Sequence, residues 1–339
     1  MMGFRVSSFA NLRCCIKYLF FVAMLSLCAQ SHALADWARQ QRDIMGTRIS
    51  VELWYTDPGI AADCSRRVFT EMERIDALMS SYLASSELSF INENAAHSWV
   101  DLGDELRHLI RRSIYFSQIS GGAFDITYAS VGYAYDYRKH QQPSDQLITR
   151  KLQAIDYRHI ELGERGIRFK NDAVRIDLGG IAKGYAVDRA IDLLQKCGIV
   201  EAMVSAGGDS RIIGDREGRP WMIGIQHPRQ AEGIALRLPL SDSAISTSGD
   251  YERFYIENGQ RIHHIINPDT GRSAKASWSA TVTGPDAMTT DALSTTLFIL
   301  GALDGLALIE SLEGFDAIII DSHGKVHYSS GFMDPASSE

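Results

Sequence analysis

The stretch 177–188, with the sequence DLGGIAKGYAVD, constrains the fold more than any other part of this 339-residue chain. Apolar and polar residues alternate just before it, which predicts a short half-buried strand over 174–178. The pair Gly179-Gly180 then allows a tight turn, and apolar residues at every fourth position predict an amphipathic helix over 182–196. A glycine turn that leads into a helix N-terminus is typical of a site for an anionic ligand, because free backbone N–H groups meet there.

Composition and missing motifs exclude several classes of function. The formal net charge is −8 and no basic stripe is visible, so a nucleic-acid surface is not expected. The glycine turn is neither a dinucleotide-binding G-x-G-x-x-G sequence nor a Walker A loop. A zinc enzyme and a serine hydrolase are also disfavoured, because the chain contains no H-E-x-x-H, no Cys/His cluster and no G-x-S-x-G.

The first 35 residues have the pattern of an export signal. A basic leader precedes an apolar run over 18–29, which is too short to span a bilayer comfortably, and small residues predict cleavage after Ala35. The end of the apolar run also resembles a lipoprotein processing site, although leucine stands where a small residue is usual. A lipid anchor at Cys28 is therefore the alternative. We expect an exported, periplasmic protein with one mature domain over 36–339.

Cleavage would leave two cysteines, Cys64 and Cys197, in the mature chain. Two cysteines provide neither a disulfide framework nor a cysteine-rich metal site. Their spacing does not determine whether they pair with each other.

The order of the predicted elements indicates an α+β fold with mixed or antiparallel sheets and flanking helices. Amphipathic helices are expected over 60–82 and 105–119, and a largely apolar helix over 286–300. A hairpin is predicted with its turn at 257–260. The expected strands are 49–53, 201–204, 211–214, 221–226, 234–240, 244–246, 251–256, 261–266, 280–283, 316–321 and 326–328.

Asp291 and Thr295 are the strongest candidates for metal ligands. They are four residues apart on the predicted helix over 286–300, so both oxygen atoms can face one ion. Hard oxygen ligands of this kind suit Mg²⁺, which usually keeps waters or substrate phosphates in its other positions. The structural alternative is an Asp in the first helical turn and a core-facing Thr that bonds back to a helix carbonyl.

Several single residues have both a structural and a functional interpretation. His263 and His264 are neighbours in a predicted strand, so their side chains should point to opposite faces, and an inward His is more often structural than catalytic. Asp125 follows two glycines and is placed either to cap a turn or to accept hydrogen bonds from a ligand. Asp209 is expected to organise a turn, and Tyr82 to be a surface or half-buried aromatic residue.

Seven short motifs occur in the order in which they stand in the FAD:protein FMN transferases, the ApbE-like family. Each motif is modest, but the whole series is specific, and it covers the chain from about Met45 to Gly301. The sequence thus resembles this family over nearly all of its mature part. The motifs are 45–47 (MGT), 122–125 (GAFD), 177–185 (DLGGIAKGY), 206–209 (AGGD), 246–251 (STSGDY), 264–268 (HIINP) and 286–295 (DAMTTDALST).

The resemblance implies roles for individual residues and an α+β fold with a T-fold-like core. The flavin site would be lined by Met45, Tyr82, Ala123, Phe124 and Asp125. The resemblance also implies that Asp177 and Lys183 contact FAD and that an aliphatic residue of the His-containing strand, Ile265 or Ile266, packs on it. The implied Mg²⁺ ligands are the Gly180 carbonyl, Asp291 and Thr295.

The implied reaction is a Mg²⁺-dependent transfer of the FMN half of FAD to a Thr or Ser hydroxyl of a membrane redox protein, with release of AMP. Positioning and charge neutralisation dominate this kind of phosphoryl chemistry. Lys183 is placed to help neutralise charge, and His264 is our candidate base, because a neutral imidazole is available near pH 7. Many relatives have Asp where this chain has Asn267, which changes how that turn is held but removes no implied metal ligand.

Two other functions are compatible with the same motifs. In the first, water replaces the protein hydroxyl, and the enzyme is a metal-dependent FAD pyrophosphatase that makes FMN and AMP. In the second, the protein is a periplasmic flavin-binding module without chemistry, and the paired Asp291 and Thr295 count against that interpretation. The sequence identifies no particular acceptor protein.

Overall fold

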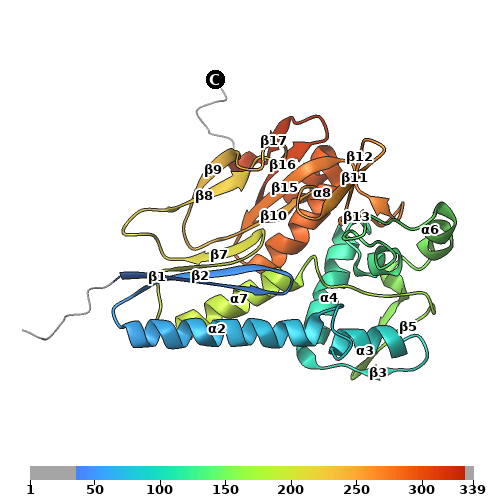
Figure 1. Ribbon diagram of the computed structural model, residues 1–339, viewed down its shortest axis with the longest axis horizontal. Helices are drawn as coiled ribbons and strands as arrows, with labels where there is room; N and C mark the ends of the chain where they lie inside the picture. The colour runs from blue at the N-terminus through green and yellow to red at the C-terminus, as the bar shows by residue number, and fades with distance from the viewer. Residues whose placement is uncertain (1–35, 333–339) are drawn as a thin grey trace, which may run out of the picture.

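A single large antiparallel sheet forms the centre of the molecule and confirms the predicted α+β class. The computed structural model describes residues 36–332. The eight strands lie in the order β1-β2-β6-β7-β10-β15-β16-β17, and each neighbouring pair is antiparallel (Figure 1). The bounds are β1 Asp36–Ile44, β2 Thr47–Tyr55, β6 Ala202–Ala206, β7 Asp209–Ile213, β10 Ala244–Gly249, β15 Ser277–Gly284, β16 Asp316–Asp321 and β17 Val326–Tyr328.

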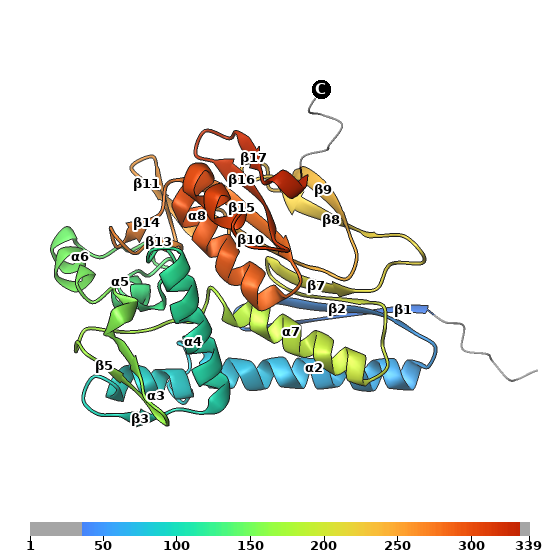
Figure 2. The same cartoon turned by 180° about the vertical axis from the view of Figure 1, so that it is seen from behind.

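Three long helices pack against this sheet and against one another. They are α2 (Pro58–Met79), α7 (Ala182–Lys196) and α8 (Ala287–Ile309). Helix α7 contacts α2, α8, β6 and β7, whereas α8 contacts β10, β15 and β16. Figure 2 shows α7 and α8 in front of the sheet, with their N-terminal ends meeting. The predicted helices over 60–82, 182–196 and 286–300 are therefore confirmed. The bounds of the first two differ by at most three residues, whereas α8 continues to Ile309, nine residues beyond its predicted end.

Helix α8 is long and apolar enough to cross a membrane, judged by length and composition alone. More than half of its most apolar window is buried inside the protein, where the helix packs on strands β7, β10, β15 and β16 of the large sheet. Gly301 interrupts the helix with a φ of 78°, a backbone conformation that glycine adopts without strain. We interpret α8 as a core helix, because its apolar surface is used to cover the sheet.

A smaller lobe, built from residues that follow α2, lies beside the ends of the long helices and appears in green in Figure 1. Its longest helix, α4, agrees with the helix predicted over 105–119 and contacts α8. The segment 128–137 includes one short helical turn, α5. The elements of the lobe are α3 Glu87–Asn94, β3 Val100–Asp101, α4 Asp104–Ile119, η1 Ile126–Tyr128, α5 Ala129–Gly132, α6 Asp145–Leu152, η2 Tyr157–His159, β4 Ile160–Leu162 and β5 Gly166–Phe169.

Three two-stranded ribbons complete the fold. The hairpin β11–β12 turns at Asn258-Gly259, where both residues have positive φ, as a two-residue hairpin turn requires. Strand β11 begins three residues later than predicted, because Tyr251 to Arg253 belong to a turn, and β12 ends three residues earlier than predicted. The ribbon strands are β8 Trp221–Gln226, β9 Ile234–Leu240, β11 Phe254–Glu257, β12 Gln260–His263, β13 Ile266–Asn267 and β14 Arg272–Ser273, and a short 3-10 helix, η3 Ser330–Phe332, follows β17.

The strand predicted over 174–178 is wrong. The alternating burial is present, but the segment pairs with no strand, because side chains take the place of a strand neighbour. Asn92 of α3 accepts from the Ile176 N–H at 2.8 Å and donates to the Ile176 carbonyl at 2.9 Å, and the Ser130 hydroxyl accepts from the Arg175 N–H at 3.0 Å. The extended chain before the glycine turn is thus held by the smaller lobe.

Cys64 and Cys197, whose pairing the sequence left open, form a disulfide that joins α2 to the C-terminal end of α7. Their Cα atoms lie 6.3 Å apart, within the usual range for a disulfide. The bond fixes two helices that also pack against each other through apolar side chains. The predicted leader and Cys28 lie outside the described residues.

Candidate active site

The site is organised by a close crossing of α7 and α8 near their N-terminal ends. Gly184 makes this crossing possible, because a Cβ at that position would overlap the Ala287 carbonyl and lie 2.8 Å from the Asp291 Cβ. The Gly184 N–H donates to Asp291 Oδ2 at 3.0 Å. The crossing therefore places the start of the glycine-turn helix directly against the predicted metal-binding segment.

A second contact, from Asp188, holds the start of α8 in place. The Asp188 carboxylate accepts from the backbone N–H groups of Ala287 and Met288, both at 2.9 Å, and from Arg211 at 2.8 Å. These N–H groups belong to the first turn of α8 and have no partner within the helix. Asp188 appeared in the sequence only as one charge on the polar face of its helix, and nothing local marked it as a cap for another helix.

Lys183 lies between two buried carboxylates. Its ammonium group forms an ion pair with Asp209 and a second one with Asp291 Oδ1 at 3.5 Å. Both Asp side chains are 2–3% exposed, whereas Lys183 remains 27% exposed. The prediction that Asp209 only organises a turn missed this contact, which depends on strand β7 lying next to α7.

Burial and an excess of negative charge shift the pKa values of Asp291 and Lys183. Burial is the largest cause that raises the pKa of Asp291, to about 7, and the Asp209 carboxylate raises it further, while Lys183 and the Gly184 N–H oppose the shift. Burial disfavours the charged form of Lys183, but the two carboxylates outweigh it and raise the pKa of Lys183 above its usual value. Two buried carboxylates thus face one ammonium group, so the site has room for one more positive charge.

Two of the predicted metal ligands, the Gly180 turn and Thr295, are neighbours, and Asp291 lies one turn before Thr295 on α8. A Cβ placed on Gly180 would lie 3.4 Å from Thr295 Oγ1, so the glycine turn and this hydroxyl are neighbours. Thr295 makes no bond back to a carbonyl of α8, unlike its neighbours in the helix. Within residues 36–332, no three His, Cys, Asp or Glu side chains form a metal cluster. One carboxylate, one hydroxyl and one carbonyl suit Mg²⁺, which retains water or phosphate ligands.

Asp177 and the aromatic residues around it border the same glycine turn. Asp177 Oδ1 accepts from the Gly179 N–H at 2.7 Å and from the Tyr128 hydroxyl at 3.0 Å. Phe124 is buried and reaches within 3.2 Å of a Cβ position on Gly180. Tyr82 follows the end of α2 and is 85% exposed, which leaves its ring free for a ligand.

Asp125 is occupied by the protein itself. Its Oδ1 atom accepts from the Thr127 N–H at 2.8 Å and from the Thr127 hydroxyl at 2.6 Å, while Oδ2 accepts from the Tyr157 N–H at 2.7 Å. Of the two interpretations from the sequence, the structure shows the turn cap. Ala123, two residues earlier, is half-buried against the core. A role in binding flavin stays a prediction for these two residues.

The motif at Met45 reaches the site through a hairpin turn. Met45 and Gly46 both have positive φ and form the turn between β1 and β2. The Gly46 carbonyl accepts from Arg253 at 3.2 Å, and the Arg253 carbonyl accepts from the His264 N–H, also at 3.2 Å. On the other side, the Gly207 N–H donates to the Arg48 carbonyl at 3.1 Å, so segments far apart in sequence are joined here.

The two adjacent histidines differ as predicted. His263 is 2% exposed, and its Nε2 bonds to the Ala274 carbonyl at 2.8 Å while its Nδ1 accepts from the Ile265 N–H at 3.3 Å. His263 is therefore a satisfied structural residue. The side chain of His264 is half-buried, and its Nδ1 has no hydrogen-bond partner among the described residues. Ile265 and Ile266 are both buried, so either could pack on a ligand only after local movement.

Burial is the largest cause that lowers the pKa of His264, to about 3, and the neighbouring charges of Arg253 and Lys183 contribute. At neutral pH its imidazole is uncharged and has a free lone pair.

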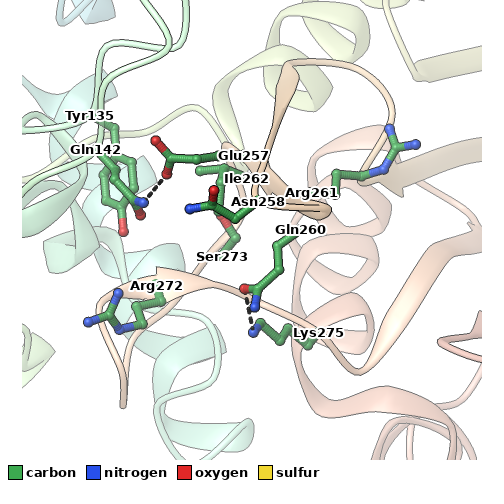
Figure 3. Close-up of a pocket in the computed structure, with 10 residues that line it drawn as sticks. All are labelled: Tyr135, Gln142, Glu257, Asn258, Gln260, Arg261, Ile262, Arg272, Ser273 and Lys275. Atoms are coloured by element: carbon green, nitrogen blue, oxygen red, sulfur yellow. Dashed lines mark hydrogen bonds between the residues drawn. The ribbon is translucent and has the colours of Figure 1, made fainter.

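A separate polar pocket lies between the loop that precedes α6 and the hairpin β11–β12 (Figure 3). Tyr135 and Gln142 border it on one side, and Glu257 and Arg261 on the other. None of its lining residues is a predicted site residue, and Arg272 at its edge is paired with Asp145 at 2.6 Å. We place the candidate site at the crossing of α7 and α8, because Lys183, Asp291 and the Gly180 turn lie there.

The fold and the site define an α+β protein whose glycine turn, ammonium group and buried carboxylates suit a phosphorylated ligand and a cation. The sequence model of the ApbE family matches residues 45–319. An FAD:protein FMN transferase from Vibrio cholerae is 30% identical over 306 residues, which cover 87% of this chain and 91% of that protein. One from Haemophilus influenzae is 31% identical over 283 residues, covering 78% and 81%.

Solved structures agree with the sequence comparison. The ApbE protein from Thermotoga maritima superposes with a TM-score of 0.80 at 32% identity, covering 88% of this chain and 98% of its own. The flavin transferase ApbE from Vibrio cholerae superposes with a TM-score of 0.79 at 27% identity, also covering 88% and 98%. The chain belongs to the ApbE family.

Proposed function

We propose that this protein is a Mg²⁺-dependent FAD:protein FMN transferase, which moves the FMN half of FAD onto a Thr or Ser hydroxyl of an acceptor redox protein and releases AMP. One observation carries the proposal: Lys183, Asp291, Thr295 and the Gly180 turn meet at the crossed N-terminal ends of α7 and α8. The named relatives, FAD:protein FMN transferases of Vibrio cholerae and Haemophilus influenzae, support the choice of reaction.

The residues of this chain would bind and orient the diphosphate of FAD. The start of α7 and the Lys183 ammonium favour a phosphate oxygen by charge, since a helix N-terminus and an ammonium both attract anions. Met45, Tyr82 and Phe124 would bracket the flavin ring, with the exposed ring of Tyr82 free to stack on it. Held in this way, the phosphorus of the FMN half would face an incoming hydroxyl.

Asp291, Thr295 and the Gly180 carbonyl would hold the Mg²⁺ ion. When bound, the ion would neutralise diphosphate charge and polarise the reacting phosphoryl group. The deficit of positive charge around Asp291 and Asp209 supports a cation at this place. Asp209 would keep the Lys183 ammonium close to the ion site without touching the ion.

His264 would accept the proton of the acceptor hydroxyl as the new P–O bond forms and the P–O bond to AMP breaks. Its uncharged imidazole and unpartnered Nδ1 support this role. A pKa of about 3 makes a weak base, but the lowering by Arg253 and Lys183 would be offset by the negative charge of a bound diphosphate.

An oxidising location is part of the proposal. The leader sequence predicts export, and the disulfide between Cys64 and Cys197 is of a kind that persists in the periplasm and not in the cytosol. Acceptors would be subunits of membrane redox complexes that present a flexible Thr or Ser. Attachment of the enzyme to the inner membrane through Cys28 remains the alternative to a free mature form.

The test mixes the purified protein with FAD, Mg²⁺ and an acceptor domain, and follows acceptor mass and in-gel flavin fluorescence. Asp291→Asn removes the charge of the ion site, and Asp304→Asn removes an exposed charge from the same helix as a matched control. We expect wild type and Asp304→Asn to add one FMN to the acceptor, and Asp291→Asn to lose at least two orders of magnitude in rate, as on loss of a catalytic metal.

Two outcomes would contradict the proposal. Free FMN and AMP with an unmodified acceptor, found for several acceptor domains, would make the protein an FAD pyrophosphatase. Intact FAD in the presence of Mg²⁺ would make it a flavin-binding protein without chemistry.

A further inference from the structure

A chain of hydroxyl groups connects β10 to the candidate ion site. Ser248 Oγ lies 3.1 Å from Thr295 Oγ1 and 2.9 Å from Ser294 Oγ. Ser294 Oγ lies 2.9 Å from the backbone carbonyl oxygen of Asp291. The series therefore runs from Thr295 through Ser248 and Ser294 to a carbonyl of the same helix.

The carbonyl at the end of this series determines the direction of every hydrogen bond in it. A carbonyl oxygen only accepts, so Ser294 must use its one hydroxyl hydrogen to donate to Asp291. Ser294 Oγ then accepts from Ser248, and Ser248 Oγ in turn accepts from Thr295. The reverse order would set the lone pairs of the Ser294 hydroxyl against those of the carbonyl at 2.9 Å.

We propose that Ser248 is a positioning residue for the divalent cation of this enzyme. By accepting the hydroxyl hydrogen of Thr295, Ser248 turns that hydrogen away from the ion site and leaves the lone pairs of Thr295 Oγ1 for the cation. The inference rests on the proposed function, because it concerns the ligand geometry of the same Mg²⁺ site. Partners of this kind commonly orient metal ligands, and their loss weakens metal binding.

A neighbouring pair of residues offers a matched comparison. Ser246 lies two residues earlier on the same face of β10, and its Oγ contacts the Thr290 Oγ1 of α8 at 2.9 Å. Thr290 also contacts the Ala287 carbonyl, at 3.2 Å, so this second series ends without reaching Thr295. Both pairs join β10 to α8 through hydroxyl groups, but only the Ser248 pair leads to a predicted ligand.

The experiment measures Mg²⁺ affinity by isothermal titration calorimetry on the full mature protein without FAD. We expect Ser248→Ala to weaken binding by about tenfold or more. Ser248→Thr keeps the hydroxyl and should remain within about threefold of wild type. Ser246→Ala should bind like wild type, although it removes a similar contact between the same two elements.

Ser294→Ala tests the direction of the hydrogen bonds. Without Ser294 Oγ, Thr295 Oγ1 is the one hydrogen-bond partner left to the Ser248 hydroxyl within residues 36–332, so Ser248 donates to it and the Thr295 hydrogen turns toward the cation. We expect about a tenfold loss of Mg²⁺ affinity, of the same order as in Ser248→Ala. Unfolding in urea without Mg²⁺, measured for every variant, separates this loss from a general loss of stability.

Three results would overturn the proposed role of Ser248, and the last of them would also overturn the proposed function. Equal Mg²⁺ affinity in wild type, Ser248→Ala and Ser294→Ala would overturn the role of Ser248 and leave the transferase proposal intact. A loss of affinity in Ser246→Ala as large as in Ser248→Ala would also overturn it, because any contact between β10 and α8 would then suffice. Failure of the wild-type protein to bind Mg²⁺ would overturn the proposed function and this inference together.

Discussion

His263 is a buried imidazole whose two nitrogens both have protein partners. Its Nε2–H donates to the Ala274 carbonyl and its Nδ1 accepts from the Ile265 N–H, so a second proton on Nδ1 would break a hydrogen bond. Burial lowers its pKa below the ordinary value, and its neighbour His264 is lowered to about 3. In the unfolded chain each imidazole titrates near 6.5. Protons therefore bind the unfolded state preferentially as pH falls below 6.5, and the folded state loses stability in that range.

This linkage predicts a pH-dependent contribution from His263 of up to about 2 kcal/mol at pH 5. His263→Gln retains a donor and an acceptor but does not titrate. We expect the free energy of unfolding of the variant to fall less between pH 7 and pH 5 than that of wild type, as measured by urea denaturation. An equal fall in both proteins would show that His263 accepts a proton in the folded state.

The spacing of Asp291 and Thr295 was enough to predict that they share a helix face, because a helix repeats nearly every four residues. The partners of Lys183 were not predictable in this way. Asp209 reaches Lys183 only because β7 lies between β6 and β10, a sheet order with no local sequence signal. The contact of Ser248 with Thr295 was not predictable either, because Ser248 is one of several hydroxyl residues in the motif 246–251.

At the scale of elements, the crossing of α7 and α8 depends on the absence of a side chain at Gly184. Gly184→Ala would press a methyl group against the backbone of Ala287, which cannot move without displacing α8. We expect a loss of about 3 kcal/mol in the free energy of unfolding, measured in urea, together with weaker Mg²⁺ binding.

Gly59→Ala is the control for that substitution. Gly59 lies in the first turn of α2, where a Cβ would meet only the Asp57 carboxylate at 3.1 Å. A change of less than about 1 kcal/mol is expected there. Helix propensity favours Ala at both positions, so similar losses for both variants would mean that the close crossing at Gly184 does not determine the effect.

Helices with a strong periodic pattern were predicted well. A segment whose backbone hydrogen-bonds to side chains, and not to a neighbouring strand, was predicted wrongly. Helices α2, α4 and α7 were expected within a few residues of their observed bounds, and α8 was expected at its observed start but ends nine residues later than predicted. The segment 174–178 carries the pattern of a strand, yet Asn92 and Ser130 satisfy its backbone. Periodicity reports which side chains are buried, and it does not report what the backbone bonds to.

For the whole molecule, the disulfide between Cys64 and Cys197 closes a sequence separation of 133 residues. Such a long loop restricts the unfolded chain strongly, so Cys64→Ser with Cys197→Ser should lower the free energy of unfolding by about 3–5 kcal/mol. Urea denaturation with and without dithiothreitol measures the effect. Dithiothreitol should destabilise wild type and leave the double variant unchanged. A wild type insensitive to reductant would contradict the prediction.

The sheet order has a consequence for how the chain is made. Strand β2 pairs with β6, which places Val51 opposite Val204, so the second strand of the sheet has no inner neighbour until most of the chain has been synthesised. Pairing over such a distance is slow, because loop closure precedes any gain in contacts. A nascent chain of this topology therefore acquires its tertiary structure late, and a chain without tertiary structure can be threaded through a narrow pore.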